Sequence, residues 1–335
     1  MTKKRLFALL VILVFILAIS VQLLFGAKPK EEAKLDPSAG AAAHVFLKEI
    51  TDTIGARVAG TENEKKIADY MALNFNKMGY KTVVQPFTYD STDETTKITK
   101  KVQSLNVYAL KPGLSKKEII VGAHMDSKDV GVGADDNGSA LAVMLEVAEK
   151  LKDIKTPYTI KFVAFGAEET GENGSLYYVS QMDKAAIANT QIMINMDSLA
   201  VGDDMNVYGG YGKDGLVRDY ALKVAREMGL NLKTNMGENP EYPLGSTGDW
   251  SDHDPFVKAG MKYIYFEATN WLLGDKDGYT QVNIKFGDQG AIWHTQYDNM
   301  KYIEETFPGR MDERLRTFTM VLKKILTDYN FELKK

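Results

Sequence analysis

Short apolar runs alternate with amphipathic segments along most of the chain. Ile119–Ala123 is an uninterrupted apolar run, and residues 158–165 and 190–196 are rich in β-branched, aromatic and long apolar residues, as is typical of buried strands. Between the first two runs, apolar side chains recur at helical spacing from Leu141 to Leu151. Strands that alternate with helices predict an α/β fold: a single globular domain with a central mixed, mostly parallel β-sheet flanked by helices.

Other segments extend this pattern. We expect further strands at residues 81–89, 104–110, 205–208 and 262–266, with a polar hairpin turn over 91–101 between the first two. We expect helices that begin near residue 45 and that span 62–78, 175–182, 216–228, 252–259 and 312–329. Residues 233–250 are rich in glycine and proline and residues 270–292 lack periodicity, so both are predicted to be long loops, which in compact domains usually carry function.

Polar side chains follow the first apolar run. His124 and Asp126 come directly after it, so they leave the predicted strand at its carboxyl end, where open α/β sheets bind ligands. A glycine-flanked turn then carries Asp135 and Asp136 to the start of the next helix, where the helix dipole and capping favour carboxylates. An imidazole among carboxylates suits a zinc ion, although a capped surface turn beside an unconnected histidine would have the same sequence.

Two more predicted strands end in acids. Glu168 and Glu169 follow residues 158–165, Asp197 follows residues 190–196, and His294 lies in a late loop. Adjacent glutamates after a strand point in different directions, so one can bind a metal while the other accepts a proton from water, as metal-assisted hydrolysis requires. The alternative is a solvated pair of loop acids.

Composition restricts the chemistry. The chain has 335 residues and no cysteine, which permits a sizeable core and excludes disulfides, a cysteine nucleophile and thiolate metal ligands. The formal net charge is -4, from 41 basic and 45 acidic residues. The first 27 residues hold three of the basic residues and no acid, so the remainder has 38 basic and 45 acidic residues, a net charge of -7. An acidic body argues against nucleic acid as a partner.

The N-terminus predicts export. Residues 6–25 are almost wholly apolar and about long enough to span a bilayer, and the basic residues before them place the body outside the cell. We predict that residues 1–27 are a signal anchor, or a signal peptide cleaved near Ala18–Ser20, and that residues 28–42 are a linker to the folded domain, residues 43–335. The expected location is the cell membrane, with a single pass and an extracellular domain, or secretion if the segment is cleaved. The oligomeric state stays open.

Seven short motifs occur in a fixed order. They are Arg57–Thr61, Gly122–Ser127, Gly133–Ser139, Ala167–Gly171, Asn195–Asp197, Ser251–Phe256 and His294–Asp298. These motifs resemble those of peptidase family M28, the co-catalytic di-zinc aminopeptidases. Each is weak alone, but all of them in the family's order, over roughly residues 45–330, are specific. The resemblance implies an M28-like peptidase domain with a zinc-peptidase fold.

The resemblance also implies a metal site and a base. Two zinc ions would share five ligands: Asp136 as the bridge, His124 and Asp197 on one ion, and Glu169 and His294 on the other. Glu168 would be the general base, and Asp126 would orient His124, as metal-bound imidazoles usually need. Asp135 could be the bridge instead, or a helix cap. Cobalt or manganese can also occupy sites of this kind.

The substrate side of the site is less defined by the motifs. Asp252, His253, Trp293 and Tyr297 are predicted to bind substrate, although Asp252 and His253 fit a satisfied cap and a core histidine equally well. Some relatives have a tyrosine directly before the last histidine, to stabilise the oxyanion. Trp293 stands there in this chain and can donate only through its indole nitrogen, so Tyr297, Tyr242 and His253 are candidate replacements.

The resemblance therefore implies a membrane-tethered, extracellular zinc aminopeptidase. It would hydrolyse N-terminal residues of peptides, using a water held between the two metals and a glutamate base. One alternative is a glutaminyl cyclase, which has a similar fold and one zinc ion; the presence of both His124 and Asp197 favours two metals and a peptidase. Another is a non-catalytic binding ectodomain, which would be expected to have lost ligands or the base.

Overall fold

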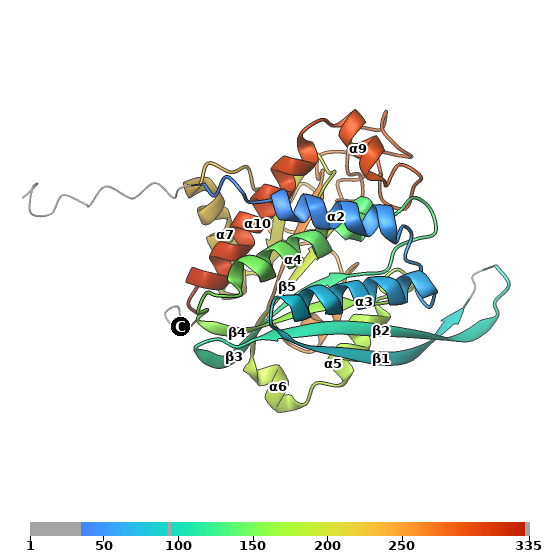
Figure 1. Ribbon diagram of the computed structural model, residues 1–335. Coiled ribbons are helices and arrows are strands. Elements are labelled where there is room, and N and C mark those ends of the chain that lie inside the picture. Colours follow the sequence, from blue (N-terminus) through green and yellow to red (C-terminus); the bar gives the residue numbers. More distant parts are fainter. Residues whose placement is uncertain (1–34, 93–94, 332–335) are drawn as a thin grey trace, which may run out of the picture. The chain divides into compact units, whose positions relative to one another are not determined.

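The computed structural model describes residues 35–92 and 95–331, and its centre is one seven-stranded β-sheet with strand order β1-β2-β4-β3-β5-β7-β6 (Figure 1). The strands are β1 (Lys81–Thr92), β2 (Thr99–Lys111), β3 (Ser115–His124), β4 (Tyr158–Phe165), β5 (Thr190–Asp197), β6 (Asp204–Gly209) and β7 (Tyr263–Thr269). The central strands β4, β3, β5 and β7 pair in parallel, whereas β1, β2 and β6 join by antiparallel pairing. The predicted mixed α/β fold is confirmed.

Helices cover both faces of the sheet. One layer holds α2 (Ala41–Thr53), α3 (Glu62–Lys77), α4 (Ala140–Leu151), α7 (Leu216–Glu227) and α10 (Arg310–Asp328). The shorter helices are α5 (Asn173–Ser180), α6 (Lys184–Asn189), α8 (Asp254–Lys258) and α9 (Met300–Thr306), of which α5 and α6 lie on the opposite side of the sheet in Figure 1. Because parallel sheets are covered on both faces, their strands are apolar throughout.

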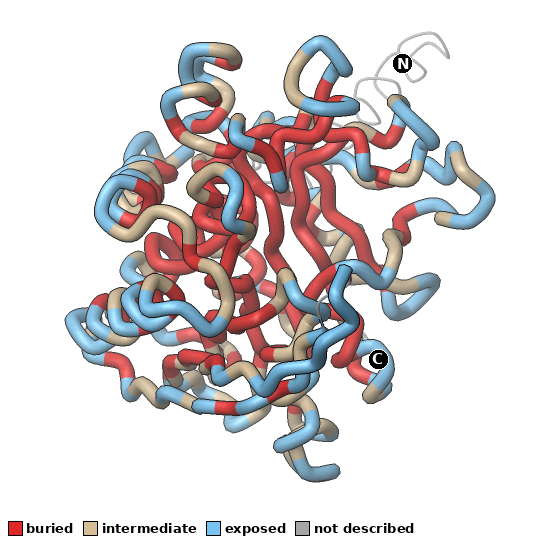
Figure 2. Tube along the Cα trace, turned by 90° about the vertical axis from the view of Figure 1, so that its right-hand side faces the viewer, coloured by how far each residue is buried: buried red, intermediate tan, exposed pale blue. Residues whose placement is uncertain are grey.

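Strand β3 shows how one sequence run serves two cores. Successive strand residues point to opposite faces, so Ile119 and Val121 join the large cluster beneath the five long helices. Ile120 points the other way and packs in a second cluster with Phe165 and with Phe256 of α8. Figure 2 shows the central strands buried along their length. The strand ends that follow are therefore held on a rigid support.

The observed elements differ from the predicted ones mainly where burial is low. Strands β1 and β2 continue into the predicted turn, and their pairing extends to Thr92 opposite Thr99. This arm of the hairpin projects from the domain in Figure 1, and its outer residues are mostly exposed. Backbone pairing alone extends the two strands there, so no alternation of apolar and polar residues predicted the extension. Helices α6 and α9, of 6 and 7 residues, were not predicted.

The predicted anchor, residues 1–27, and residues 28–34 of the predicted linker lie outside the described residues. Helix α2 begins at Ala41, and the backbone N–H groups of Gly40 and Ala43 donate to the buried Glu146 carboxylate at 2.9 and 2.7 Å. Within residues 35–92 and 95–331, no helix is both long and apolar enough to cross a membrane. The boundaries of anchor, linker and domain stay predictions.

Candidate metal centre

The parallel strands bring the sequence motifs together at one edge of the sheet. His124 is the last residue of β3, Asp197 is the last residue of β5, and Glu168 follows β4 by three positions. Strand β3 lies between β4 and β5, and both pair with it in parallel. The carboxyl ends of the three strands therefore meet, as the sequence predicts for an open α/β sheet.

Asp136 lies between two imidazoles. Its Oδ1 is 3.1 Å from His124 Nε2, and its Oδ2 is 3.0 Å from His294 Nε2. Asp197 Oδ1 lies 3.3 Å from His124 Nε2, and Glu169 Oε2 lies 2.9 Å from His294 Nε2. The five predicted ligands thus form two groups of three that share Asp136, with the ligand atoms of each group within 4.8 Å of one another.

The donor chemistry of this cluster fits metal ions. Two imidazoles and three carboxylates are ligands that zinc accepts. Burial lowers the pKa of His294, but its hydrogen bonds with Asp136 and Glu169 outweigh burial and raise that pKa to about 10. The pKa of His124 is likewise raised, against burial, by the charges of Asp197 and Glu168. Glu169 Oε1 is buried without a hydrogen-bond partner, so one ligand atom is free to coordinate.

Glu168 lies beside the cluster without belonging to either group of three. Its Oε2 is 3.9 Å from His124 Nε2, and its side chain is 11% exposed. Burial raises the pKa of the Glu168 carboxyl well above its ordinary value, and the neighbouring carboxylate of Asp197 adds to this. A carboxylate with a raised pKa accepts a proton more readily, as a general base must.

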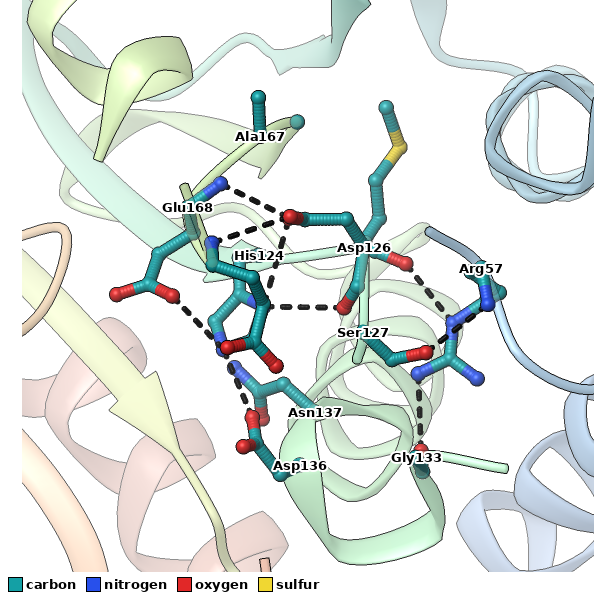
Figure 3. A network of polar contacts seen from close by, with 12 residues as sticks. Arg57, His124, Asp126, Ser127, Gly133, Asp136, Asn137, Ala167 and Glu168 are labelled. Atoms are coloured by element: carbon teal, nitrogen blue, oxygen red, sulfur yellow. Dashed lines mark hydrogen bonds and ion pairs between the residues drawn. The ribbon is translucent and has the colours of Figure 1, made fainter. Parts of the chain in front are cut away.

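Asp126 positions the two glutamates through the backbone (Figure 3). Its Oδ1 and Oδ2 accept hydrogen bonds from the N–H groups of Glu168 and Glu169, at 3.0 and 3.1 Å. The predicted link to His124 is made mainly by the Asp126 carbonyl oxygen, 3.2 Å from Nδ1, whereas the carboxylate is 3.7 Å away. Asp126 therefore orients three side chains of the site at once.

Arg57 and Asp298 hold the turn that carries Asp136. The Arg57 guanidinium is fully buried and donates to the carbonyl oxygens of Met125 and Gly133 at 2.8 and 2.9 Å, which joins the end of β3 to the turn. Asp298 accepts from the N–H groups of Asp135 and Asp136, at 2.6 and 3.2 Å. Asp298 therefore supports the shared aspartate.

Asp135 faces away from the cluster. Its Oδ1 accepts from the N–H groups of Ala200 and Val201, at 2.6 and 3.1 Å, and its Oδ2 accepts from Gln281 Nε2 at 2.6 Å. The alternatives in which Asp135 bridges two metals or caps α4 do not fit, because both oxygens are engaged by the segments that follow β5 and β7. Asp136 is the carboxylate that the turn presents to the histidines.

A cavity of about 410 Å³ opens beside the cluster. Of the four residues predicted to bind substrate, Trp293 lines it, whereas Asp252, His253 and Tyr297 do not. His253 is a core residue: its ring stacks on Tyr265 with 4.9 Å between centroids, its Nε2 is 3.1 Å from the Gly248 carbonyl oxygen, and burial lowers its pKa to about 4. Asp252 is fully buried, and Tyr297 packs on Tyr302.

Four charged residues of the cavity wall were not predicted from the sequence: Lys128, Glu172, Glu267 and Asp277. Lys128 Nζ is 2.9 Å from Glu169 Oε2 and also donates to the Glu169 carbonyl oxygen at 2.5 Å. Glu267 lies in β7, which continues past the predicted end at residue 266. An acid at the end of an apolar run was the signal that identified Asp197, and it could have identified Glu267. The remaining wall is largely aromatic: Tyr242, Trp250, Tyr265, Tyr279 and Trp293.

Comparison with known proteins supports the resemblance. The profile of peptidase family M28 matches residues 106–319. The chain is 34% identical over 316 residues to the alkaline phosphatase isozyme conversion protein of Escherichia coli K12, covering 87% of this chain and 91% of that protein. It is 28% identical over 192 residues to aminopeptidase YwaD of Bacillus subtilis 168, covering 56% of this chain and 37% of that protein.

Solved structures share the fold. A zinc aminopeptidase from Bacillus subtilis superposes with a TM-score of 0.69 at 19% identity, covering 88% of this chain and 97% of that one. A glutaminyl cyclase from Fimbriiglobus ruber has a TM-score of 0.63 at 17% identity, covering 90% and 99%. The family profile and the relatives together confirm the prediction of a metallo-aminopeptidase, and the chain belongs to peptidase family M28.

Proposed function

We propose that this protein removes N-terminal residues from peptides at a site that holds two zinc ions, with Glu168 as the general base. The observation that carries the proposal is the position of Asp136, whose two oxygens face His124 and His294 at 3.1 and 3.0 Å. A carboxylate shared in this way is suited to join two metal sites. Asp197 then completes one site and Glu169 the other.

The residues of the chain divide the chemistry between them. Zinc, when bound, lowers the pKa of a coordinated water and stabilises negative charge on the substrate carbonyl oxygen. Glu168 takes a proton from the attacking water and returns it to the departing amine, and its Oε2 stands 3.9 Å from the ligand nitrogen of His124. Asp126 holds the backbone of Glu168 and Glu169, so the base and one ligand keep a fixed separation.

The cavity favours the amino end of a peptide. Glu172, Glu267 and Asp277 line it besides the metal-facing acids, and Lys128, its one basic wall residue among the described residues apart from the histidines, is paired with Glu169. An acidic wall attracts a free ammonium group and disfavours a carboxylate. The names of several relatives, such as aminopeptidase YwaD, agree with this direction of attack.

Metal content and turnover, measured on one sample, test the proposal. We expect two zinc ions per chain by elemental analysis, together with hydrolysis of aminoacyl chromogenic amides that a chelator abolishes and zinc restores. Cobalt or manganese, added to the stripped protein, would show whether another ion serves better. Absence of bound metal after reconstitution, or turnover that survives a chelator, would contradict the proposed site.

A glutaminyl cyclase is the second candidate, since such enzymes share the fold. Cyclisation of peptides with N-terminal glutamine, with one zinc ion per chain, would favour it over the peptidase. A non-catalytic binding domain is less compatible with the site, because both groups of three ligands and Glu168 are in place. Metal binding without turnover of amides or glutaminyl peptides would favour that alternative.

We also propose that the domain acts outside the cell, tethered by residues 1–27. The support is the apolar run 6–25 behind three basic residues. Fractionation of cells, with protease added to intact cells, tests the location, and the N-terminal sequence of the purified protein tests cleavage. A full-length protein in the membrane fraction with a protease-accessible domain supports the anchor; a soluble cytoplasmic protein would contradict export.

A further inference from the structure

The two groups of candidate ligands differ in what holds the carboxylate that they do not share. We call the group His124, Asp136 and Asp197 the inner site and the group Asp136, Glu169 and His294 the outer site. In the inner site, Asp197 Oδ2 accepts from the uncharged hydroxyl of Ser251 at 2.7 Å. In the outer site, Glu169 Oε2 contacts the ammonium group of Lys128 at 2.9 Å. A hydroxyl orients a ligand without adding charge, whereas an ammonium group places a full positive charge beside it.

Lys128 is held beside Glu169 by more than this ion pair. Its Nζ also donates to the Glu169 backbone carbonyl oxygen at 2.5 Å, and that oxygen is not a candidate ligand. Lys128 lies in the loop after β3 and lines the cavity. Because the backbone contact does not involve the carboxylate, the ammonium group keeps an anchor beside Glu169 whichever partner the carboxylate has.

The Lys128 side chain carries its charge at neutral pH. Burial lowers the pKa of Lys128, but the charge of Glu169 and its hydrogen bond outweigh burial and raise that pKa. The charges of Glu168 and Asp136 add to this rise. Two of these three acids, Glu169 and Asp136, are outer-site ligands, so the charge of Lys128 and that of a metal ion act on the same carboxylates.

Both oxygens of Glu169 lead a metal ion into the influence of this cation. Oε2 lies 2.9 Å from Lys128 Nζ and 2.9 Å from His294 Nε2, and Oε1 is buried without a hydrogen-bond partner. An ion at Oε2 shares that atom with the ammonium group, and an ion at Oε1 binds a carboxylate whose charge Lys128 already partly neutralises. In both cases the attraction between the carboxylate and the metal is weaker.

The imidazoles of the two sites differ in the same direction. The His124 side chain is 1% exposed, and its Nδ1 lies 3.2 Å from the Asp126 carbonyl oxygen. The His294 side chain is 39% exposed, and within the described part of the chain its Nδ1 has no hydrogen-bond partner. A partner on the second ring nitrogen orients the ring and makes the ligating nitrogen more basic, so His124 is the better prepared ligand.

We propose that Lys128 weakens metal binding at the outer site, so that this protein holds one metal ion tightly at the inner site and a second, exchangeable ion at the outer site. The inference rests on the proposed site for two metal ions. Lys128 then sets the concentration of free metal at which the outer site fills and the two-metal centre is complete.

Zinc titration of the metal-stripped full chain against a competing chelator tests this independently of turnover. We expect two ions with unequal affinities in the wild type. Lys128→Met removes the charge and Lys128→Gln keeps a hydrogen-bond donor; both should tighten the weaker ion about 10- to 100-fold and the tighter ion by less than about threefold. Lys152→Met, an exposed change at the end of α4, is the matched control and should change neither affinity.

Removal of an outer-site ligand assigns the weaker ion. His294→Ala leaves the three inner ligands in place, so one ion should remain, with the affinity of the tighter wild-type ion. Adding Lys128→Met to this variant should change that affinity by less than about threefold, because the inner site lies farther from the ammonium group. Loss of the tighter ion in His294→Ala would contradict the order of the two sites.

The role of Lys128 is overturned by equal affinities in the wild type, by no change of the weaker affinity in Lys128→Met, or by an equal gain at both sites. Weaker binding in Lys128→Met that Lys128→Gln restores would also overturn it, and would show that Lys128 serves to orient Glu169. The proposed two-metal site fails in a different way, if saturating zinc gives only one ion per chain in both the wild type and Lys128→Met.

Discussion

The metal side and the aromatic side of the cavity are built in different ways. Four of the five candidate ligands come from the ends of β3 and β5 or from short turns that follow β3 and β4, and backbone hydrogen bonds fix them. Tyr242, Trp250 and Tyr279 come from the long loops 233–250 and 270–292 and are placed by packing against one another and against Trp271 or Trp293. The first side is organised by the sheet and the second by contacts distant in sequence.

This difference suggests a division of tasks. A reaction centre must hold its groups within fractions of an ångström, which a rigid sheet edge provides. Specificity can be altered by changing loop side chains without moving the ligands. Glu267 belongs to the sheet and also lines the cavity, where Tyr208 and Tyr265 hydrogen-bond to its carboxyl group.

The largest effect is expected from Glu168→Gln, which removes the proposed proton acceptor on the metal side and leaves the metal ligands in place. Glu168→Gln keeps the shape and hydrogen bonding of the side chain but cannot take a proton, so kcat should fall about 10²- to 10⁴-fold while both metals stay bound. Amide turnover and elemental analysis on the same preparation check this. Normal turnover would refute the base assignment, and loss of metal would show that Glu168 is a ligand.

Removal of the Arg57 side chain, which holds the turn on the metal side, is expected to lower stability strongly. Arg57→Met leaves the buried carbonyl oxygens of Met125 and Gly133 and the partly buried one of Val132 without their donor, so we expect a loss of about 3–5 kcal/mol in the free energy of unfolding. Urea denaturation measures it. Arg226→Met, at an exposed position of α7, is the matched control and should change stability by about 0.5 kcal/mol or less. Equal effects would contradict the structural role of Arg57.

The contrast between residues placed by the sheet and residues placed by long loops explains which parts of the site the sequence could predict. The ends of apolar runs located His124, Glu169 and Asp197, because a parallel sheet brings strand ends together whatever the loops do. Lys128 was missed because its bond to Glu169 joins two loops 41 positions apart, and no local pattern encodes that contact. Asp252 and His253 lie in a motif but outside the cavity wall. A motif shows which residues recur and not which way their side chains face, so it could not predict this placement.

Behind the aromatic side, a pH effect on stability is expected from the core residue His253, whose ring stacks on the wall residue Tyr265. Burial lowers the pKa of His253 to about 4, below its ordinary value of 6.5, so the unfolded chain binds the proton more readily. Stability is therefore complete above pH 6.5 and is lost as the pH falls towards 4, by about 3 kcal/mol. The free energy of unfolding of wild type minus that of His253→Gln, compared at pH 7 and pH 4.5, isolates this contribution. A difference independent of pH would contradict it.

The smallest effect is expected from Ser251→Ala, at the point where the metal side and the aromatic side of the cavity meet. Ser251 directly follows the loop 233–250 and donates to Asp197 Oδ2 at 2.7 Å, while accepting from Asn195 Nδ2 at 2.8 Å. Ser251→Ala should weaken the ion held by His124 and Asp197 about 10- to 100-fold, because a carboxylate ligand loses its orienting partner, and should leave the ion at Glu169 and His294 bound. Zinc titration against a competing chelator resolves the two affinities, with the exposed Ser180→Ala on α5 as control. If both ions weaken together, the two sites are not independent and the loop supports the whole centre; if neither weakens, the sheet alone positions Asp197.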